Sequence, residues 1–181
     1  MKNKLLFISV LLIFALIFAS CTPEAAEKLV EGVAAADPST APNAHAQYFE
    51  IDENGAVSLK DKTIVPVSLI IPQKVDEKEV KSVKDCKEST FTSVRIPGNV
   101  KTIEDNAFFG CTSLTSVIID SGVESIGEDA FVGCTALEMV QIYSSGISID
   151  RDAFPDREME CWYLGTEYDS IDDIREYIKN H

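Results

Sequence analysis

The chain has 181 residues, an ordinary apolar content of 45% and a formal net charge of −14. This length suits one domain with extensions. A chain this acidic is not expected to bind nucleic acid or an anionic membrane surface.

The first twenty residues have the pattern of an export signal. Lys2 and Lys4 precede an apolar run from Leu5 to Ala19, which is short for a membrane span. Small residues close the run just before Cys21, and this arrangement resembles a bacterial lipobox, in which the cysteine is lipidated. We predict a lipoprotein signal peptide over 1–20 and a membrane anchor at Cys21. Cleavage without lipid and an uncleaved anchor are the alternatives.

The next segment, 21–46, is rich in Ala, Pro and acidic residues. This composition predicts a flexible tether, and we expect His45 within it to be a solvated loop residue. Over 47–66, two strand-like runs flank Asn54-Gly55, which predicts an N-terminal cap hairpin. A calcium loop at Asp52 is the alternative, but the acidic spacing does not continue into an EF-hand.

The segment 67–156 repeats itself at a step of about 23 residues. Its clearest copies begin at Phe91, Leu114 and Leu137, and a degenerate copy begins near Ser68 with its register left open. In the copy from Leu114, alternation sends Val117 and Ile119 to one side of a strand, and Ser116 and Ile118 to the other. Val123 and Ile126 point inward from a second extended piece. Glu128 to Phe131 then predicts one helical turn, ended by a left-handed Gly133.

One copy is too short to bury its own apolar side, so the repeats must stack. The fold class expected is mostly β with short helical turns: a solenoid of about four rungs, with an N-terminal β-hairpin cap and a C-terminal α-helix cap. Over 157–181, Cys161 to Thr166 predict a final strand and turn. Ser170 opens a short helix with a capping pattern. Its apolar stripe consists of Ile171, Ile174, Tyr177 and Ile178. The acidic residues of this helix argue against membrane binding, the alternative, and favour a lid over the last rung.

The repeat pattern, L-T-S-V-x-I followed by V-x-S-I-G-x-x-A-F-x-G-C-T, resembles the BspA-like (treponemal-type) leucine-rich repeat. The likeness is strong over roughly half of the chain. It implies a bacterial surface or secreted protein that binds other proteins, and it implies no catalysis.

Reactive residues are few. His45 and His181 are the only histidines, both in expected end segments, and no phosphate-binding loop is present. A carboxylate pair of the glycosidase type is the remaining catalytic alternative. Cys111 and Cys134 occupy one repeat position, so their side chains should point the same way, which favours free buried thiols over a disulfide. We expect no enzyme activity, no cofactor and no metal site.

Outward strand positions form the candidate binding face. Its members are Ile70, Ser93, Arg95, Ser116, Ile118, Asp120, Met139, Gln141 and Tyr143. Ile70, Ile118, Met139 and Tyr143 are apolar where a purely structural surface would be polar, so they indicate a ligand-binding face. The convex turns are the competing surface.

The signal pattern favours a lipid-anchored protein, and the resemblance to the BspA-like repeat implies a cell-surface protein-binding module, an adhesin or surface antigen of the bacterial cell envelope. It would sit at the outer membrane or cell surface, held by its N-terminal lipid, with an extracellular or envelope protein as partner. The alternative is a periplasmic structural or regulatory lipoprotein that binds a partner of the same cell.

Overall fold

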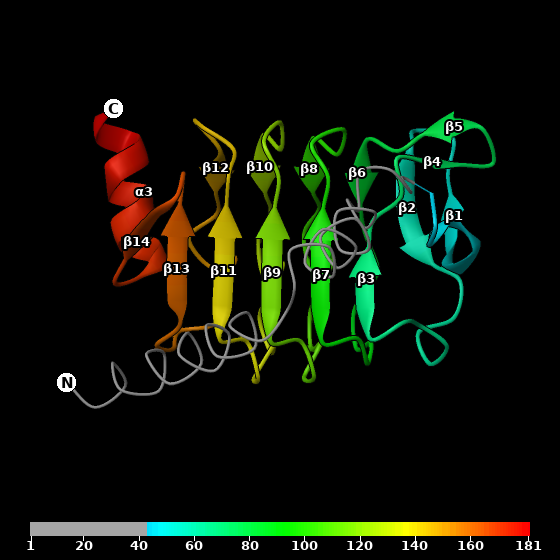
Figure 1. Cartoon of the computed structure of the whole chain (residues 1–181), viewed down its shortest axis with the longest axis horizontal. Coiled ribbons are helices and arrows are strands. Elements are labelled where there is room, and N and C mark those ends of the chain that lie inside the picture. Colours follow the sequence, from blue (N-terminus) through cyan, green and yellow to red (C-terminus); the bar gives the residue numbers. More distant parts are fainter. Residues whose placement is uncertain (1–42) are drawn as a thin grey trace, which may run out of the picture. The chain divides into compact units, whose positions relative to one another are not determined.

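The structure is a computed structural model and describes residues 43–181. The expected signal peptide over 1–20, Cys21 and the tether as far as residue 42 lie outside the described residues. Two six-stranded sheets line opposite sides of a row of rungs (Figure 1). One of them, here called the β9 sheet, has the order β14-β13-β11-β9-β7-β3. Its strands are β3 (Ser68–Ile70), β7 (Ser93–Ile96), β9 (Ser116–Ile119), β11 (Met139–Ile142), β13 (Glu160–Tyr163) and β14 (Thr166–Tyr168).

The other sheet, here called the β10 sheet, has the order β1-β2-β6-β8-β10-β12. Its strands are β1 (Phe49–Ile51), β2 (Ala56–Leu59), β6 (Ser82–Val83), β8 (Thr102–Ile103), β10 (Ser125–Ile126) and β12 (Ser148–Ile149). A short antiparallel ribbon, β4 (Lys74–Val75) with β5 (Lys78–Glu79), interrupts the first rung. The remaining elements are the 3₁₀ turn η1 (Ala46–Tyr48) and the helix α3 (Ile171–Asn180).

Strand register confirms the repeat. Ser93, Ser116 and Met139 lie opposite one another in neighbouring parallel strands. Val117 and Ile119 are fully buried, whereas Ser116 and Ile118 are partly exposed, as alternation predicts. The degenerate first copy has the register Ser68 opposite Ser93. The β9 sheet contains one parallel strand more than the four rungs expected, because β13 pairs with β11 as a further rung.

A third ladder of hydrogen bonds closes each rung on the side of the turns. Phe108 N–H donates to Ala130 O, and Phe131 N–H donates to Ala153 O one rung further. The expected helical turn is wrong: these residues form consecutive turns, and Asp129 has a φ of 55°. Gly133 is left-handed, as predicted, with a φ of 78°.

The turns send a column of phenylalanine rings into the core. Phe131 stacks between Phe108 and Phe154, with ring centroids 5.1 and 4.9 Å away. Cys86 takes the corresponding place one rung earlier, since its N–H donates to Ala107 O. This smaller side chain leaves room that the Phe91 ring takes up, with its centroid 6.1 Å from that of Phe108.

The cysteines Cys86, Cys111, Cys134 and Cys161 are free thiols and fully buried, as expected for small core residues. The Cys111 thiol donates to Cys86 O at 3.2 Å, and the Cys134 thiol donates to Phe108 O at the same distance. These two thiols therefore each donate to a backbone carbonyl of the preceding rung, and neither forms a disulfide.

The predicted N-terminal hairpin is confirmed, and it closes the β10 sheet. β1 pairs with β2, and β2 then pairs in parallel with β6 of the first rung. Asp52 organises the connecting loop by accepting the N–H groups of Asn54 and Ala56. Lys84 forms an ion pair with the same carboxylate. Asp52 is thus a loop-capping residue with a lysine partner.

The expectation that His45 is a solvated loop residue is wrong. Its ring is partly buried, and Nδ1 accepts the backbone N–H of Ile70 at 2.8 Å. Asn43 accepts the N–H of Lys74 in the same way. Residues 43–46, which composition assigned to the tether, therefore satisfy donors at the outer edge of the first rung, where β3 has no strand neighbour.

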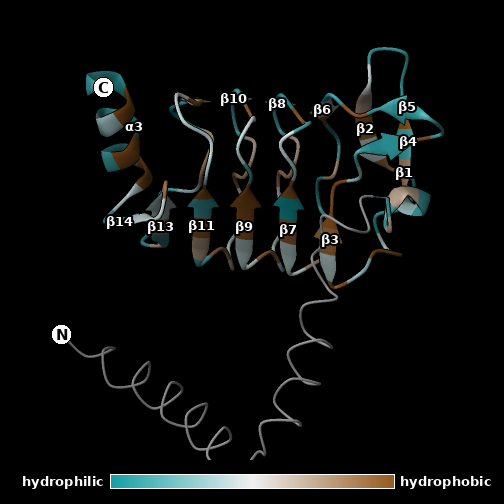
Figure 2. Ribbon diagram, turned by 45° about the horizontal axis from the view of Figure 1, so that its top comes forward, coloured by the Kyte–Doolittle hydropathy of each residue, from teal (hydrophilic) through white to brown (hydrophobic). Residues whose placement is uncertain are grey.

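At the C-terminal end, β13 turns back into β14, and α3 follows. The predicted cap is confirmed: Ser170 Oγ accepts the N–H of Asp173. Ile171 and Ile174 are buried in the core, and Figure 2 shows hydrophobic and hydrophilic residues on different sides of α3. Arg175 donates to Asp150 O just beyond β12, so α3 covers the end of the β10 sheet.

Candidate functional site

The outward side of the β9 sheet carries three columns of side chains, one residue per rung. The first runs from Ser93 through Ser116 and Met139 to Glu160, and the second from Arg95 through Ile118 and Gln141 to Trp162. The third runs through Asp120 and Tyr143 to Leu164, each donating its N–H to the strand of the preceding rung. Every predicted face residue lies on this side, partly exposed or, for Tyr143, exposed at 45%. Pro72, which alternation would add to the third column, is buried because the first rung turns into the β4–β5 ribbon.

Ile118 lies in a shallow depression of about 550 Å³. The lining residues are Arg95, Gly98, Ile118, Asp120, Ser121, Gln141 and Tyr143. Arg95 and Gln141 flank Ile118 in the neighbouring strands, as the repeat register predicts. The sequence therefore brings together an apolar residue and polar neighbours in the middle of the sheet.

The one cation of this depression is already paired. Arg95 Nε lies 2.9 and 3.2 Å from the two carboxylate oxygens of Asp120, which belongs to the next rung. The pair is partly exposed, so it contributes modestly to stability and mainly fixes the two side chains. The depression is consequently close to neutral at its Arg95 end.

Sequence reasoning missed the last rung of the face. Trp162 lies opposite Gln141, and Glu160 lies opposite Met139. The sequence predicts these residues to belong to the C-terminal strand and helix cap over 157–181, whereas the pairing of β13 with β11 makes them part of a further rung. Alternation within β13, with Cys161 and Tyr163 buried and Trp162 partly exposed, is the signal that identifies them as face residues.

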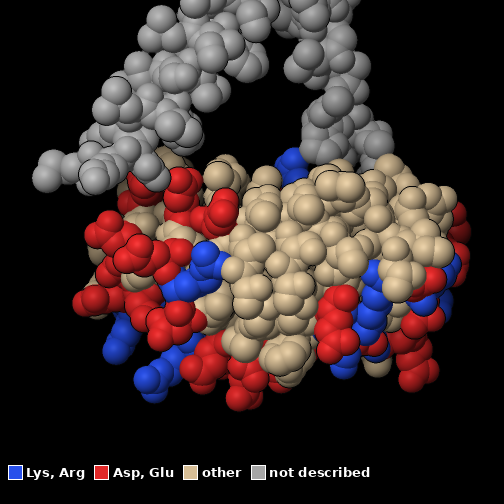
Figure 3. Space-filling view, turned by 90° about the horizontal axis from the view of Figure 1, so that it is seen from below, with Lys and Arg blue, Asp and Glu red and all other residues tan. Residues whose placement is uncertain are grey.

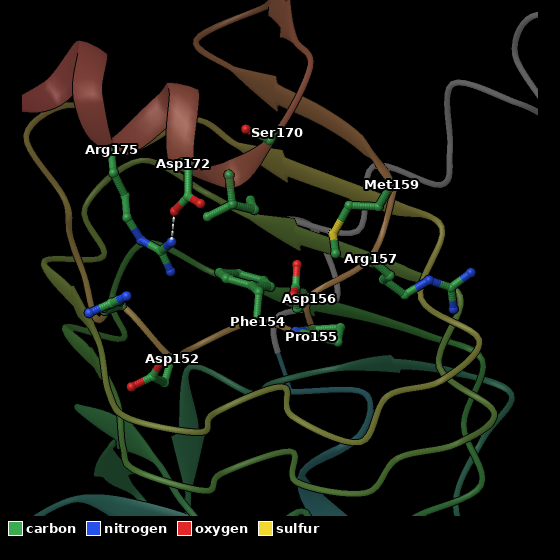
Figure 4. A pocket seen from close by; sticks show the side chains of 11 residues that line it. Asp152, Phe154, Pro155, Asp156, Arg157, Met159, Ser170, Asp172 and Arg175 are labelled. Atoms are coloured by element: carbon green, nitrogen blue, oxygen red, sulfur yellow. Dashed lines mark hydrogen bonds and ion pairs between the residues drawn. The ribbon is translucent and has the colours of Figure 1, made fainter.

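A second pocket, of about 290 Å³, lies where α3 begins (Figure 4). Phe154 and Met159 form its apolar wall, and Arg175 enters it from α3. The Arg175 guanidinium is held by Asp172 and by Asp150 O, while its Nε has no hydrogen-bond partner among the described residues. The guanidinium therefore joins α3 to the last turn of the β10 sheet.

The titratable groups with shifted pKa values have structural roles. Lys84 and the N–H of Ala56 lower the pKa of Asp52 to about 2. Burial raises the pKa of the Cys161 thiol to about 11, which disfavours a nucleophilic thiolate. Within residues 43–181, no three His, Cys, Asp or Glu side chains are grouped so as to hold a metal ion. No helix in that part of the chain is both long enough and apolar enough to cross a membrane.

Stacked parallel strands, a one-residue-per-rung face and a capped core define a leucine-rich-repeat solenoid. Residues 67–175 match the family model described as the BspA type leucine-rich repeat region, in six copies. The chain belongs to this family.

Two solved structures are similar. A leucine-rich cell surface protein from Faecalibacterium prausnitzii is 28% identical, with a TM-score of 0.42 over 56% of this chain and 29% of that protein. A leucine-rich-repeat protein from Bacteroides capillosus is 24% identical, with a TM-score of 0.53 over 64% of this chain and 91% of that one. The second likeness shows the fold. No curated protein matches this chain.

Proposed function

We propose that this chain is a lipid-anchored cell-surface module that binds another protein through the outward side of the β9 sheet. The observation that carries the proposal is the depression around Ile118, an apolar side chain bordered by Arg95 and Gln141 in register. An apolar centre with a polar border is the usual arrangement of an interface hot spot. Membership of the BspA type family supports a role outside the cell.

The anchoring part of the proposal rests on the sequence. Ala19 and Ser20 precede Cys21 at the end of an apolar run, which is the arrangement of a lipidated export signal. Lipid attachment at Cys21 would place many copies of the domain on one membrane. A weak individual interaction would then act with high avidity.

The test is a single charged substitution on the face. Ile118→Glu removes nothing from the core, so the free energy of unfolding should change by about 0.5 kcal/mol or less. Affinity for a protein partner isolated from extracellular and envelope fractions should fall by about 2 kcal/mol or more if Ile118 is central. Binding is measured by surface plasmon resonance with purified partner.

The matched control is Phe109→Glu, because Phe109 is a comparably exposed apolar residue on the side of the turns, at 37%. It should leave binding intact. If Ile118→Glu binds as wild type does and Phe109→Glu does not, the turns are the functional surface and the proposal is wrong. Protease digestion of intact cells tests the location, since a surface-exposed domain should be degraded and a periplasmic one protected.

A further inference from the structure

Charge is distributed unevenly along the solenoid. Residues 120–181 contain fifteen acidic and four basic side chains, against eleven and nine in residues 43–119. Figure 3 shows acidic side chains at both ends of the solenoid, with the larger group at the end that carries α3. Residues 120–181 therefore carry much more net negative charge than residues 43–119, and a concentration of negative charge attracts cationic partners.

The outward face of the β9 sheet changes in the same direction. In the first column, the first two rungs carry the small Ser93 and Ser116, and the next two carry the larger Met139 and Glu160. In the third, Asp120 gives way to Tyr143 and Leu164, which are 45% and 48% exposed. Large apolar and aromatic side chains are thus concentrated where the acidic charge is highest.

Leu164 is held in a conformation that a leucine rarely adopts. It forms, with Gly165, the two-residue connection between β13 and β14, and both residues have positive φ, 50° and 82°. This hairpin turn favours Asn or Gly at its first position, since a Cβ is strained there. Because strain and exposure give this side chain little role in the stability of the fold, Leu164 is a candidate contact residue for a partner.

Two carboxylates border Trp162 on the same side of the sheet. Glu167 lies opposite Trp162 across the β13–β14 hairpin, and Glu160 precedes it by two residues in β13. Both are exposed, and neither forms an ion pair within residues 43–181. An aromatic ring between free carboxylates is a favourable setting for a guanidinium or an ammonium group, which gains from both ring and charge.

We propose that the last two rungs of this face bind a cationic segment of a protein partner. The segment's Arg or Lys side chains would meet Trp162, Glu160 and Glu167, and its apolar side chains would contact Tyr143 and Leu164. This inference rests on the proposed function, because it specifies the chemistry of the partner for the same face. Charge complementarity selects the occupant: a second copy of this acidic chain would be repelled.

Trp162 is the single tryptophan of the chain, so its fluorescence reports on this site alone. The probe is a synthetic peptide in which Arg and Leu alternate with Ser, and the comparison peptide has Glu in place of every Arg. We expect the Arg peptide to change Trp162 emission saturably, and the Glu peptide to leave it unchanged. The apparent affinity should fall as salt is raised, since exposed charges are screened within about 8 Å at physiological ionic strength.

The decisive variant is the double change Glu160→Gln and Glu167→Gln, which should weaken binding of the Arg peptide roughly three- to tenfold. Its control, Glu158→Gln with Glu176→Gln, removes the same charge from the loop before β13 and from α3. That control should lose less than about twofold. Leu164→Asn places a residue that accepts positive φ in the turn, so this variant should be at least as stable to urea as wild type. It should nevertheless bind the peptide more weakly, because the apolar side chain is gone.

Equal losses in the two double variants would mean that net charge alone attracts the peptide, and the proposed site would be wrong. Absence of any emission change, or equal binding of the Glu peptide, would overturn the cationic chemistry. In either case the proposed function stands if Ile118→Glu weakens binding of the isolated protein partner as expected above. It fails together with this inference if that variant has no effect.

Discussion

The Phe131 ring lies parallel to the Phe108 ring of the preceding rung, with centroids 5.1 Å apart and an interplanar angle of 7°. Phe154 stacks on its other side at 4.9 Å. The rings are therefore a continuous column that couples three rungs through one residue type. Because each rung contacts only its neighbours, a defect in the middle of the column weakens both interfaces.

Phe131→Ala should accordingly lower the free energy of unfolding by about 3–5 kcal/mol, because it removes a fully buried ring and leaves a cavity between two others. Urea denaturation measures the loss. Phe109→Ala, at a more exposed position of the same turns, should cost about 0.5 kcal/mol or less. A loss below about 1 kcal/mol at Phe131 would contradict the stacking described here.

Gly98→Ala should also destabilise the fold, for a reason that concerns the backbone. A Cβ at Gly98 would lie 1.8 Å from the carbonyl oxygen of Ser121 in the next rung, so the rungs would have to separate. We expect a cost of about 1–3 kcal/mol. Gly146→Ala is the comparison, because no atom lies within 4 Å of its added Cβ and the cost comes from a φ of 67° alone. Gly146→Ala should lower the free energy of unfolding by about 1 kcal/mol. If Gly98→Ala is as stable as Gly146→Ala, the close approach of the two rungs is disproved.

His45 should make the stability depend on pH in a narrow window. Burial lowers the pKa of His45 below its ordinary value of 6.5, and acceptance of the Ile70 N–H requires a neutral ring. As pH falls from 6.5 toward this lowered pKa, His45 becomes protonated in the unfolded chain but stays neutral in the folded chain. The free energy of unfolding therefore declines. Above pH 6.5 the ring is neutral in both states, and the hydrogen bond from Ile70 to His45 contributes its full stabilisation to the folded state.

Chemical denaturation between pH 7 and pH 5 measures this effect. His45→Asn keeps an acceptor for the Ile70 N–H and removes the titration, so its stability should change less over the window than that of wild type. His45→Ala should lose about 0.5–1.5 kcal/mol at pH 7, because the donor is left without its partner. Asp52 titrates lower, between its ordinary 3.8 and about 2, so it does not interfere. An identical pH profile in wild type and His45→Asn would refute the assignment.

The buried thiols should react slowly while the chain is folded. Burial raises the pKa of Cys86, and the neighbouring Cys111 thiol together with burial raises that of Cys134. For Cys161, a pKa of about 11 in place of 9.0 corresponds to about 100-fold less thiolate. Alkylation followed by mass spectrometry should label these sites only after denaturation. A cross-linked peptide pair containing Cys111 and Cys134 would show that the thiols are not the free core residues described.

Cys21→Ala should release the protein from membranes or block its maturation, because the lipid would have no thiol to join. Detergent partitioning of cell extracts distinguishes the two forms. Ser20→Ala keeps a small residue before the cysteine and should behave as wild type. If the Cys21→Ala protein partitions into the detergent phase unchanged, membrane attachment does not depend on that residue.

Much of the fold was available from the sequence, because a repeat reports the same structural fact several times. The shared spacing of Val94, Val117 and Val140 identified the inward strand positions, and burial of all three confirms it. From the same alternation Ile118 had to face outward. Asn54-Gly55 and Ser170 likewise predicted the hairpin and the helix cap, since both depend on local backbone chemistry.

The tertiary structure alone decided the features in which residues distant in the sequence meet. Composition made His45 a tether residue, and only the folded chain shows its ring at an unpaired N–H of β3. Trp162 belongs to the face because β13 pairs in register with β11, although the chain between them departs from the repeat step. The Arg95–Asp120 ion pair follows from the lateral stacking of two rungs. Local propensity and periodicity act within one copy, whereas edge pairing, altered repeat length and contacts between rungs are settled by packing.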